Sequence, residues 1–539
     1  MISSPVTVGQ RVLVTFSRRQ YTAVVHKIDT EPDYGTEHIL DIDDADPGLT
    51  PVSEKELQLW EFIASYYLCT IGEVYAAAYP YGKIKSESIA ARACANALRR
   101  SEVEIESLSR RLSGLQDRYT KKEALIAKRK SSAKADPEIT AEFERQLETL
   151  HEQITVLEER LESKRREAAG ATPSLPEQKK AGKPAKPELI CSSERHSRYI
   201  EECGKTLRSG QSVLILSPDT VSCGTLRSSL EQEFPDLQVC TSKSTQAQRR
   251  RIAEAARSGA GIVVVGTRSA IFLPFSNLGL VIVDEEQDVF YKQEEPSPRY
   301  NGRDCAIKLA MIHGAKAMLG SSRPSLETLL NVRSGKYSSS ADTTGTTTIE
   351  TVDMGAEKRK KGVYGYFSFK LIEAIRNTDG KIALIRGWER TEDLQTQIEE
   401  LFPGRQIDVF RYQQIREKDL SDYGLTAVMQ ADALVDPEDF RADEKGAAIS
   451  VQLASRCSSL WIQTSVKERF DCSRSPEELL EERMTFGFPP YTRLVEYRQK
   501  GTARTIQRFF LKKDAALTAN KEEIRKGLPK GAYIDVDPL

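Results

Sequence analysis

Two short, uninterrupted runs of apolar residues, Ile262–Val265 and Leu280–Val283, stand out against an otherwise mixed pattern. Runs this short and this rich in valine and isoleucine are typical of strands buried on both faces of a parallel sheet. Three further apolar segments, SVLILS, QVCT and KAML, lie nearby, and amphipathic helical segments separate them. This alternation over residues 188–349 predicts an α/β fold with right-handed crossovers and a parallel sheet.

The same alternation returns in a second, smaller unit over residues 350–470. Its predicted strands are KIALI, QIDVF, TAVMQ and SLWIQTS, and its predicted helices are TEDLQTQIEELF and DEKGAAISVQLASR. Between the two units, the serine- and threonine-rich segment Ser338–Thr348 has the composition of a loop. Residues 471–539 begin with a helix, a Pro-Pro turn and a strand, which predicts a small C-terminal domain.

The N-terminal region, residues 1–100, predicts a β hairpin followed by a helix. Val8–Ile28 alternates between apolar and polar residues, and Ser17-Arg18-Arg19-Gln20 separates its two halves. This basic tip is either a phosphate-contacting loop or an ordinary charged turn, and the sequence leaves both open. Ser53 and Glu56 form a capping box ahead of the helix. One face of that helix carries an apolar stripe typical of a buried core, Leu57, Trp60, Ile63, Ala64 and Tyr67.

Residues 101–167 change in character, because apolar residues follow three- and four-residue spacing and charges fill nearly every other position. Two such arms flank a helix-breaking segment, Ser131–Pro137. The pattern predicts an antiparallel coiled-coil hairpin, with two dimerising segments as the alternative. Residues 168–187 are rich in proline, lysine, alanine and glycine, a composition typical of a linker.

Composition narrows the classes of function. The chain has 539 residues with 78 basic and 79 acidic side chains, so nucleic-acid binding requires local basic patches rather than a global positive field. The nine cysteines include no C-x-x-C pair, which argues against a zinc site and for free thiols in a reducing compartment. Because the sequence shows neither a signal-peptide pattern nor a membrane-length apolar run, we expect a cytoplasmic protein without a membrane partner.

The second of the two apolar runs ends in Asp284-Glu285-Glu286-Gln287. The carboxyl ends of buried parallel strands are where an open α/β sheet binds its ligand. In P-loop NTPases an Asp at this position holds Mg²⁺, and a neighbouring acid or Gln orients the attacking water. Asp284 and Glu285 are therefore candidate catalytic residues, provided that the chain also carries a phosphate-binding loop.

Several segments around this carboxylate pair resemble the PriA family of primosomal DNA helicases (primosomal protein N′). GTRSAIFLPF, VDEEQD and YKQEEPSPRYNGRD are similar to the family's GTRSALFLPF, its DEEH box, and its YKQ and PRYHARD motifs. GSSRPSLE, QADAL and GFPPY resemble later family motifs, and VGQRVLVTFSRRQ resembles its N-terminal DNA 3′-end binding domain. The resemblance covers most of the chain except residues 101–167. It implies two RecA-like lobes, the second of them reduced, with an N-terminal β domain and a truncated C-terminal domain.

The residues that bind ATP in the family are replaced here. At the family's phosphate-binding loop the resemblance places Glu194 for the glycine, Arg195 for the lysine and His196 for the threonine. Gly204-Lys205-Thr206 is no substitute, because it lies inside a helical pattern and Tyr199 stands where the earlier glycine is required. The family's cysteine-rich zinc module is missing, and its arginine-finger motif keeps one arginine and loses the second.

These replacements predict that Asp284 and Glu285 are vestigial catalytic residues. The degenerate nucleotide-binding residues are Glu194, Arg195, His196 and Arg456. A carboxylate at the cradle repels phosphate, and side chains block the backbone N–H groups that a phosphate needs. We therefore expect no ATP, Mg²⁺ or zinc as a cofactor.

The residues that contact DNA in the family are better kept. The resemblance places an aromatic and basic loop against single strands, formed by Tyr291, Lys292, Arg299, Tyr300 and Arg303. It also places Thr267 and Arg268 against the strand backbone. It places Arg18, Arg19 and Gln20 beside a DNA end or fork. Such side chains suit base stacking and phosphate pairing, but they can equally pack the lobe, and the sequence leaves both roles open.

The sequence thus predicts a PriA-like pseudo-helicase of replication restart that binds forked or single-stranded DNA without hydrolysing ATP. Primosome or replication proteins are further candidate partners, and the coiled coil would serve as an arm for a partner or for self-association. One alternative is an active ATP-dependent 3′–5′ DNA helicase with an unconventional nucleotide site. The other is an interaction scaffold whose coiled coil binds partners and whose lobes do not bind DNA.

Overall fold

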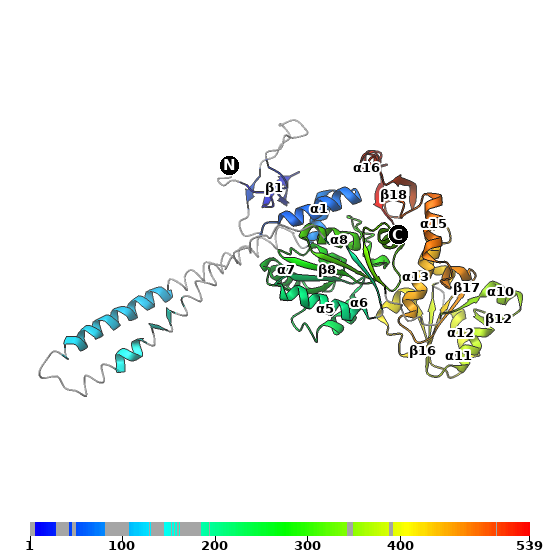
Figure 1. Cartoon of the computed structure of the whole chain (residues 1–539), viewed down its shortest axis with the longest axis horizontal. Coiled ribbons are helices and arrows are strands. Elements are labelled where there is room, and N and C mark those ends of the chain that lie inside the picture. The colour runs from blue at the N-terminus through cyan, green and yellow to red at the C-terminus, as the bar shows by residue number, and fades with distance from the viewer. Residues whose placement is uncertain are drawn as a thin grey trace. The chain divides into compact units, whose positions relative to one another are not determined.

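The computed structural model describes residues 6–28, 42–45, 50–80, 107–128, 130, 145–151, 154–155, 157–158, 161, 185–192, 194–341, 349–387, 392–502 and 504–538. The chain divides into two compact units. One consists of Met1–Glu54 with Tyr81–Ala181, and the other of Lys55–Pro80 with Gly182–Leu539. Figure 1 traces both units along the chain.

A seven-stranded sheet forms the first α/β lobe of the second unit, in the order β10-β4-β9-β8-β5-β7-β6, and every pairing in it is parallel. Its strands are β4 (Glu188–Cys191), β5 (Ser212–Leu216), β6 (Gln238–Cys240), β7 (Val263–Gly266), β8 (Leu278–Val283), β9 (Lys316–Gly320) and β10 (Ser338–Ala341). Its helices are α5 (Arg195–Arg208), α6 (Thr220–Leu230), α7 (Gln246–Ser258), α8 (Gly302–His313) and α9 (Leu326–Arg333). The predicted α/β class and the five predicted strands, β5 to β9, are confirmed.

The apolar runs of the sequence form the middle of this sheet. Leu214 on β5, Val264 on β7 and Ile282 on β8 have no exposed side-chain surface. In Figure 1, α8 lies on one face of the sheet and α5 and α6 lie on the other. Because both faces are covered, every position of a central strand is buried, and the strand reads as a continuous apolar run rather than an alternation.

β10 corrects the sequence prediction, because it lies where composition indicates a loop. Ser338–Ala341 pairs in parallel register with β4, residue 338 opposite 188 through residue 341 opposite 191. It is an edge strand held by backbone hydrogen bonds, so it needs no apolar side chains and its serines carry no strand signal. The rest of the predicted loop, residues 342–348, lies outside the described residues.

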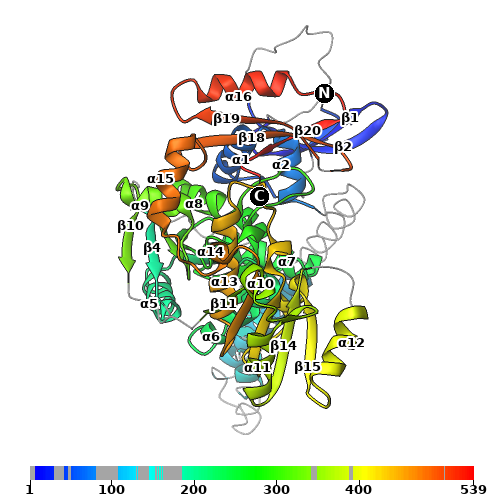
Figure 2. The same ribbon diagram turned by 90° about the vertical axis from the view of Figure 1, so that its right-hand side faces the viewer.

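A five-stranded parallel sheet forms the second lobe, in the order β11-β17-β16-β14-β15. Its strands are β11 (Ile349–Asp353), β14 (Lys381–Arg386), β15 (Ile407–Arg411), β16 (Tyr423–Met429) and β17 (Leu460–Thr464). Its helices are α10 (Met354–Arg359), α11 (Phe369–Asn377), α12 (Glu392–Leu401), α13 (Ala442–Ala454) and α14 (Lys467–Phe470), and β12 (Val363–Tyr364) pairs with β13 (Phe367–Ser368). The four predicted strands and two predicted helices are confirmed, and α11 and α12 lie beside β14 and β15 in Figure 2.

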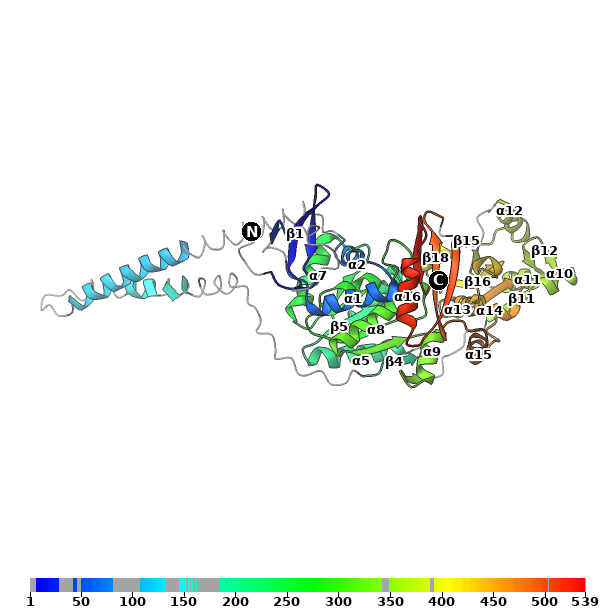
Figure 3. The same ribbon diagram turned by 90° about the horizontal axis from the view of Figure 1, so that it is seen from above.

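The C-terminal module holds α15 (Pro476–Phe486), α16 (Leu517–Lys526) and an antiparallel sheet in the order β19-β18-β20. The strands are β18 (Thr492–Gln499), β19 (Thr505–Lys512) and β20 (Ala532–Val536). α1 (Glu54–Tyr67) and α2 (Ile71–Ala78) run beside this module in Figure 3, and the Lys521 ammonium donates to the Ser65 carbonyl 3.1 Å away. Four of the five stripe residues of α1 are buried, as predicted, and Ala64 is half-buried.

In the first unit, β1 (Arg11–Phe16) lies between β2 (Arg19–Val24) and β3 (Asp44–Ala45) in an antiparallel sheet. The predicted hairpin is confirmed, but its turn is shorter than the sequence suggests, because Arg19 already pairs with Phe16. Ser17 and Arg18 form the turn, with φ of +49° and +63°, as a type I′ hairpin turn requires. Residues 107–128 and 145–151 are helical, and residues 168–184 of the predicted linker lie outside the described residues.

Candidate nucleotide and nucleic-acid sites

The predicted carboxylate pair lies at the carboxyl end of β8, in the interior of the first sheet. Asp284 is 4% exposed, and its amide donates to the Leu216 carbonyl at the end of the adjacent β5. Glu285 follows with φ of +48°, a left-handed conformation that costs a residue with a Cβ about 1 kcal/mol or more. The chain thus turns sharply as it leaves the strand, and both carboxylates lie at the edge of the sheet where an α/β fold binds its ligand.

Arg195 occupies this edge. It is the first residue of α5, and its Nε donates to Asp284 Oδ1 over 2.7 Å while its Nη2 contacts Glu285 Oε1. His196, the next residue, has its Nε2 3.8 Å from Asp284 Oδ2. A guanidinium group presents several donors in one plane, so a single arginine can bridge two carboxylates.

Tyr199 is a second donor to the Asp284 carboxylate. It lies one turn after Arg195 on α5, is fully buried, and its hydroxyl donates to Asp284 Oδ1 over 2.9 Å. The hydroxyl fits only because residue 320, at the end of β9, is a glycine. A Cβ at Gly320 would lie 1.5 Å from Tyr199 Oη.

The charges at this edge compensate one another. Burial by itself raises the pKa of Asp284, but the interactions with His196 and Arg195 outweigh it, and the pKa falls to about 2. Burial lowers the pKa of Arg195, but the charges of Asp284 and Glu285 raise it well above its ordinary range. Arg195 is therefore a fixed cation and Asp284 a fixed anion.

These residues do not fit a Mg²⁺–nucleotide. Mg²⁺ requires an accessible carboxylate, and the β- and γ-phosphates require a cation and free backbone N–H groups. Here Arg195 and Tyr199 bind Asp284 directly, and the amide of Glu194 donates to Ser192 Oγ over 3.1 Å. Gly204-Lys205-Thr206 lies inside α5, as the sequence predicts, so its backbone groups serve the helix.

The other acid of the motif, Glu286, is the centre of a buried network. Its carboxylate accepts from Arg303 Nη1 at 3.0 Å, from the Ser325 amide at 2.7 Å and from Thr328 Oγ1 at 2.9 Å. Glu286 is 1% exposed. The network joins β8 to α8 and to the N-terminus of α9, and it assigns Arg303 to the interior of the lobe.

The predicted DNA-binding loop is largely buried as well. The Tyr291 hydroxyl lies 2.6 Å from the Asp284 carbonyl, and Tyr300 has 1% of its surface exposed. Lys292 Nζ lies 2.7 Å from Asp535 Oδ1 and donates to the Val536 carbonyl of β20. The Arg299 guanidinium lies 3.7 Å from the centre of the Tyr533 ring. For these residues and Arg303, the structure favours packing of the lobe over the DNA contacts that the resemblance implies.

The remaining predicted residues of the two lobes lie apart from this core. Thr267 and Arg268 are half-buried at the surface, and Arg268 Nη1 donates to the Phe290 carbonyl over 2.8 Å. Arg456 belongs to the second lobe, where its Nη2 donates to the carbonyls of Ile415 and Lys418. The structure thus gives Arg456 a role within its own lobe rather than at Asp284.

The tip of the β1–β2 hairpin carries an exposed aromatic and basic face. The register pairs Phe16 with Arg19, and Tyr21 lies on the same face two residues further along β2. Phe16 is 61% and Tyr21 45% exposed, and Arg18 and Arg19 are exposed beside them. The side chain of Gln20 lies outside the described residues. Exposed rings beside guanidinium groups suit stacking on bases and pairing with phosphates.

Comparison with known proteins places this hairpin in a named module. A family model for the PriA 3′ DNA-binding domain (3′BD) matches residues 2–80. The replication restart protein PriA of Haemophilus influenzae is 43% identical over 151 residues, or 27% of this chain and 20% of that protein. PriA of Rickettsia felis is 35% identical over 208 residues (37% and 32%), and PriA of Chlamydia pneumoniae is 33% identical over 192 residues (34% and 26%).

The chain is similar to PriA proteins over these stretches. The matched stretches span between 20% and 32% of the length of these PriA proteins. Among solved structures, RecG bound to a three-way DNA junction is 14% identical with a TM-score of 0.35, over 56% of this chain and 41% of that chain.

Sequence reasoning missed three residues of the two sites. Tyr199 stands out in the sequence only as a residue that a phosphate-binding loop excludes, and its hydrogen bond to Asp284 joins positions 85 apart. Phe16 and Tyr21 carried a signal, because large aromatic residues alternate with polar ones next to the basic tip. The alternation alone does not show which face of the hairpin is exposed.

Two further observations concern the part of the chain that the structure describes. Within it, no group of three or more His, Cys, Asp or Glu side chains is arranged to hold a metal ion. In the same residues, no helix combines the length and apolar character needed to cross a membrane.

Proposed function

We propose that this chain is a PriA-family protein that binds forked or single-stranded DNA in replication restart and does not hydrolyse ATP. The proposed absence of ATP hydrolysis rests on the carboxyl end of β8, where Arg195 and Tyr199 bind the carboxylate of Asp284. In this proposal the two parallel α/β lobes correspond to the two RecA-like lobes of the family, with the second one reduced.

DNA binding is supported by the hairpin and by the family model over residues 2–80, which describes a 3′ DNA-binding domain. The exposed face with Phe16, Arg18, Arg19 and Tyr21 supplies rings for unpaired bases and cations for phosphates. Arg268 at the surface of the first lobe is the second contact in this proposal.

The segment 101–167 is proposed to be an antiparallel coiled-coil arm for a partner protein or for self-association. Gln116 contacts Glu158 (3.1 Å), the rings of Tyr119 and His151 lie 5.8 Å apart, and Lys122 contacts Gln146. In these three pairs the residue number of the second partner falls as that of the first rises, which is the pattern of two antiparallel helices joined in a hairpin. Primosome or replication proteins are the partners that we propose for it.

Nucleotide turnover tests the first half of the proposal. We expect the purified chain to show no DNA-stimulated ATP hydrolysis and no rise in melting temperature with Mg²⁺ and ATP, because a ligand stabilises a protein only if the folded state binds it. Asp284→Ala serves as the control, since ATPase activity that survives this substitution comes from a contaminant. ATPase activity that disappears with Asp284→Ala would instead establish the active-helicase alternative.

Fluorescence anisotropy with labelled forked DNA tests the second half. We expect binding that weakens as salt rises, because protein cations displace counterions from phosphates. Arg18→Ala with Arg19→Ala should weaken binding about tenfold. The matched control removes two exposed arginines elsewhere, Arg227 on α6 and Arg250 on α7, and should change affinity little. Absence of binding even at low salt would leave the scaffold alternative.

A further inference from the structure

The outer strand of the C-terminal sheet, β19, has one long edge that lies at the margin of the sheet. The order is β19-β18-β20, so in the part of the chain that the structure describes β19 pairs with β18 alone. The opposite edge meets the first lobe, because Lys292 Nζ donates to the Val536 carbonyl of β20 over 2.6 Å. β19 is eight residues long, as is β18. An edge of this length presents a row of backbone N–H and C=O groups that can pair with a further strand.

The two faces of β19 differ in what covers them. On one face, the Phe509 ring lies 5.0 Å from the ring of Tyr497 on β18, and the Tyr497 hydroxyl donates to the Ile524 carbonyl of α16. α16 lies along this sheet in Figure 2. The other face alternates apolar and basic side chains, all of them exposed: Ile506, Arg508, Phe510 and Lys512. Ile506 is 50% exposed, so an apolar side chain stands in water beside the open edge.

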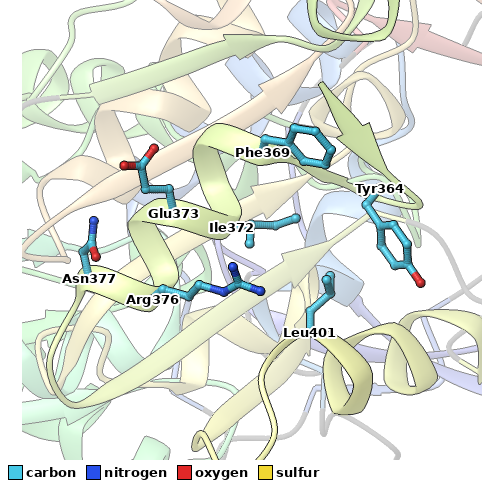
Figure 4. Close-up of a pocket in the computed structure, with 7 residues that line it drawn as sticks. All are labelled: Tyr364, Phe369, Ile372, Glu373, Arg376, Asn377 and Leu401. Atoms are coloured by element: carbon cyan, nitrogen blue, oxygen red, sulfur yellow. The ribbon is translucent and has the colours of Figure 1, made fainter. Parts of the chain in front are cut away.

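A pocket on the second lobe also exposes apolar side chains, but it differs from β19 in what its backbone offers. The pocket has a volume of about 400 Å³, and Phe369 and Ile372 project into it from α11 in Figure 4. The backbone groups of α11 bond within the helix, so only side chains are available there. β19 presents backbone groups and side chains together, and the partner that fits such an edge is another extended strand.

A second copy of β19 can supply that strand. In an antiparallel pair, residues directly opposite each other lie on the same face. If Phe509 lies on a two-fold axis opposite the partner's Phe509, then Arg508 lies opposite the partner's Phe510 and Ile506 opposite the partner's Lys512. Each cation of the exposed face thus meets an apolar side chain, and Arg508 with a phenyl ring forms a cation–π pair. The axis repeats both pairs and keeps α16 of both copies on the same side of the joined sheet.

Charge disfavours the neighbouring registers. A shift by two residues in one direction places Arg508 opposite the partner's Arg508, and Arg504 opposite the partner's Lys512. A shift in the other direction places Arg508 opposite the partner's Lys512. Like charges directly opposite each other destabilise a pair of strands. Glu496 Oε1 on β18 lies 2.8 Å from Arg508 Nε and keeps the guanidinium on this face. Charges that usually protect an edge strand from pairing therefore leave one favourable register.

We propose that two copies of this chain associate through β19, by antiparallel pairing in the register centred on Phe509. The pairing joins the two C-terminal sheets into one continuous sheet. An interface built on one strand and its flanking side chains is small, so the dimer is reversible at micromolar concentrations. It is separate from self-association through the coiled-coil arm, and it requires neither DNA nor nucleotide.

Sedimentation equilibrium of the full chain over the micromolar range tests this dimer. Ile506→Lys places a lysine opposite the partner's Lys512 on both sides of the axis, and we expect the dissociation constant to rise about tenfold or more. Adding Lys512→Glu should restore dimerisation, because each new lysine then faces a new carboxylate. Phe369→Lys is the matched control, since it also replaces an exposed apolar residue by lysine, and it should leave the dissociation constant unchanged.

Hydrogen exchange gives a readout that needs no substitution. The amides of β19 should become better protected as the concentration of the wild-type chain rises, and circular dichroism should show that the variants are folded. A chain that stays monomeric throughout the range would overturn the proposal. So would a dimer that Ile506→Lys leaves unchanged, because the coiled-coil arm would then account for it. Loss of the dimer in Ile506→Lys without recovery on adding Lys512→Glu would overturn the register and the pairing with it.

Discussion

At the scale of single residues, the end of β8 shows how a carboxylate pair is stabilised without a cation from solution. Asp284 and Glu285 share the guanidinium of Arg195, and Tyr199 supplies a neutral donor to the same oxygen. The sequence could show that Arg195 is the wrong residue type for a phosphate loop. It could not show where the side chain points, because its two partners lie 89 and 90 positions away.

The Asp284 carboxylate gives the fold a pH-dependent contribution to stability. Its pKa is about 2 in the folded chain, against about 3.9 in an unfolded chain. Between these values the unfolded chain binds more protons than the folded chain. The contribution is therefore present above about pH 4 and is lost as the pH falls toward about 2, and its size is on the order of 2 kcal/mol.

Near neutral pH, we expect Asp284→Asn to lower the free energy of unfolding by about the size of this contribution. Below about pH 4, the difference in free energy of unfolding between wild type and variant should narrow steadily. Urea unfolding of both proteins across this range measures the gap. A gap of constant size from neutral to acidic pH would mean that the stabilisation does not come from the ionised carboxylate.

At the scale of elements, strands with apolar side chains could be predicted, and the serine-rich edge strand β10 could not. β5, β7 and β8 are apolar at every position because helices cover both faces of the sheet. β10 is held at the edge by backbone pairing with β4, and its sequence, SSSA, carries no apolar signal. The hairpin of the first unit was predictable from the alternation of apolar and polar residues in its sequence, although burial along β1 falls from its first residue to its tip rather than alternating. A pattern of apolar side chains thus detects the strands that carry it and misses β10, which backbone pairing alone holds in place.

The packing of β9 against α5 depends on the missing side chain of Gly320. A Cβ there would lie 1.5 Å from Tyr199 Oη and 3.0 Å from Asp284 Oδ1. We expect Gly320→Ala to lower the free energy of unfolding by about 2 kcal/mol, as an overpacked core does. Adding Tyr199→Phe should recover part of this loss, because it removes the closest atom.

Thermal or urea unfolding of the single and double variants measures this coupling. Gly224→Ala on α6 is the matched control, since nothing lies within 4 Å of a Cβ there, and alanine in a helix is favoured over glycine by about 1 kcal/mol. If Gly320→Ala proved as harmless as the control, the contact between Tyr199 and Asp284 would not be fixed in solution.

At the scale of the whole second unit, the loop that the resemblance assigns to DNA and the residues just before it connect the first lobe to its neighbours. Asp288 Oδ2 accepts from Gln452 Nε2 of the second lobe over 2.9 Å, and Lys292 reaches Asp535 and Val536 of the C-terminal module. Burial lowers the pKa of Lys292, and the charge of Asp535 opposes that shift. Lys292, which the resemblance assigns to DNA, therefore joins the first lobe to the C-terminal module, and the nearby Asp288 joins the first lobe to the second. Sequence similarity preserves the residue types but does not distinguish these roles.

Substitution of Lys292 separates the two roles, because stability and DNA affinity respond differently. If Lys292 holds the C-terminal module in place, Lys292→Ala removes the nearer of two cations from buried Asp535 and leaves only Arg498, whose Nη1 lies 3.6 Å from Asp535 Oδ2. We then expect the free energy of unfolding to fall by about 3 kcal/mol. Affinity for forked DNA should then stay within about twofold at a temperature where the variant is folded. If Lys292 bound phosphate, affinity would fall and its salt dependence would become shallower by about one counterion. Asp535→Asn distinguishes the cases further. It should lower the free energy of unfolding in the same way, but it removes a negative charge from the module, so it should not weaken the affinity for DNA.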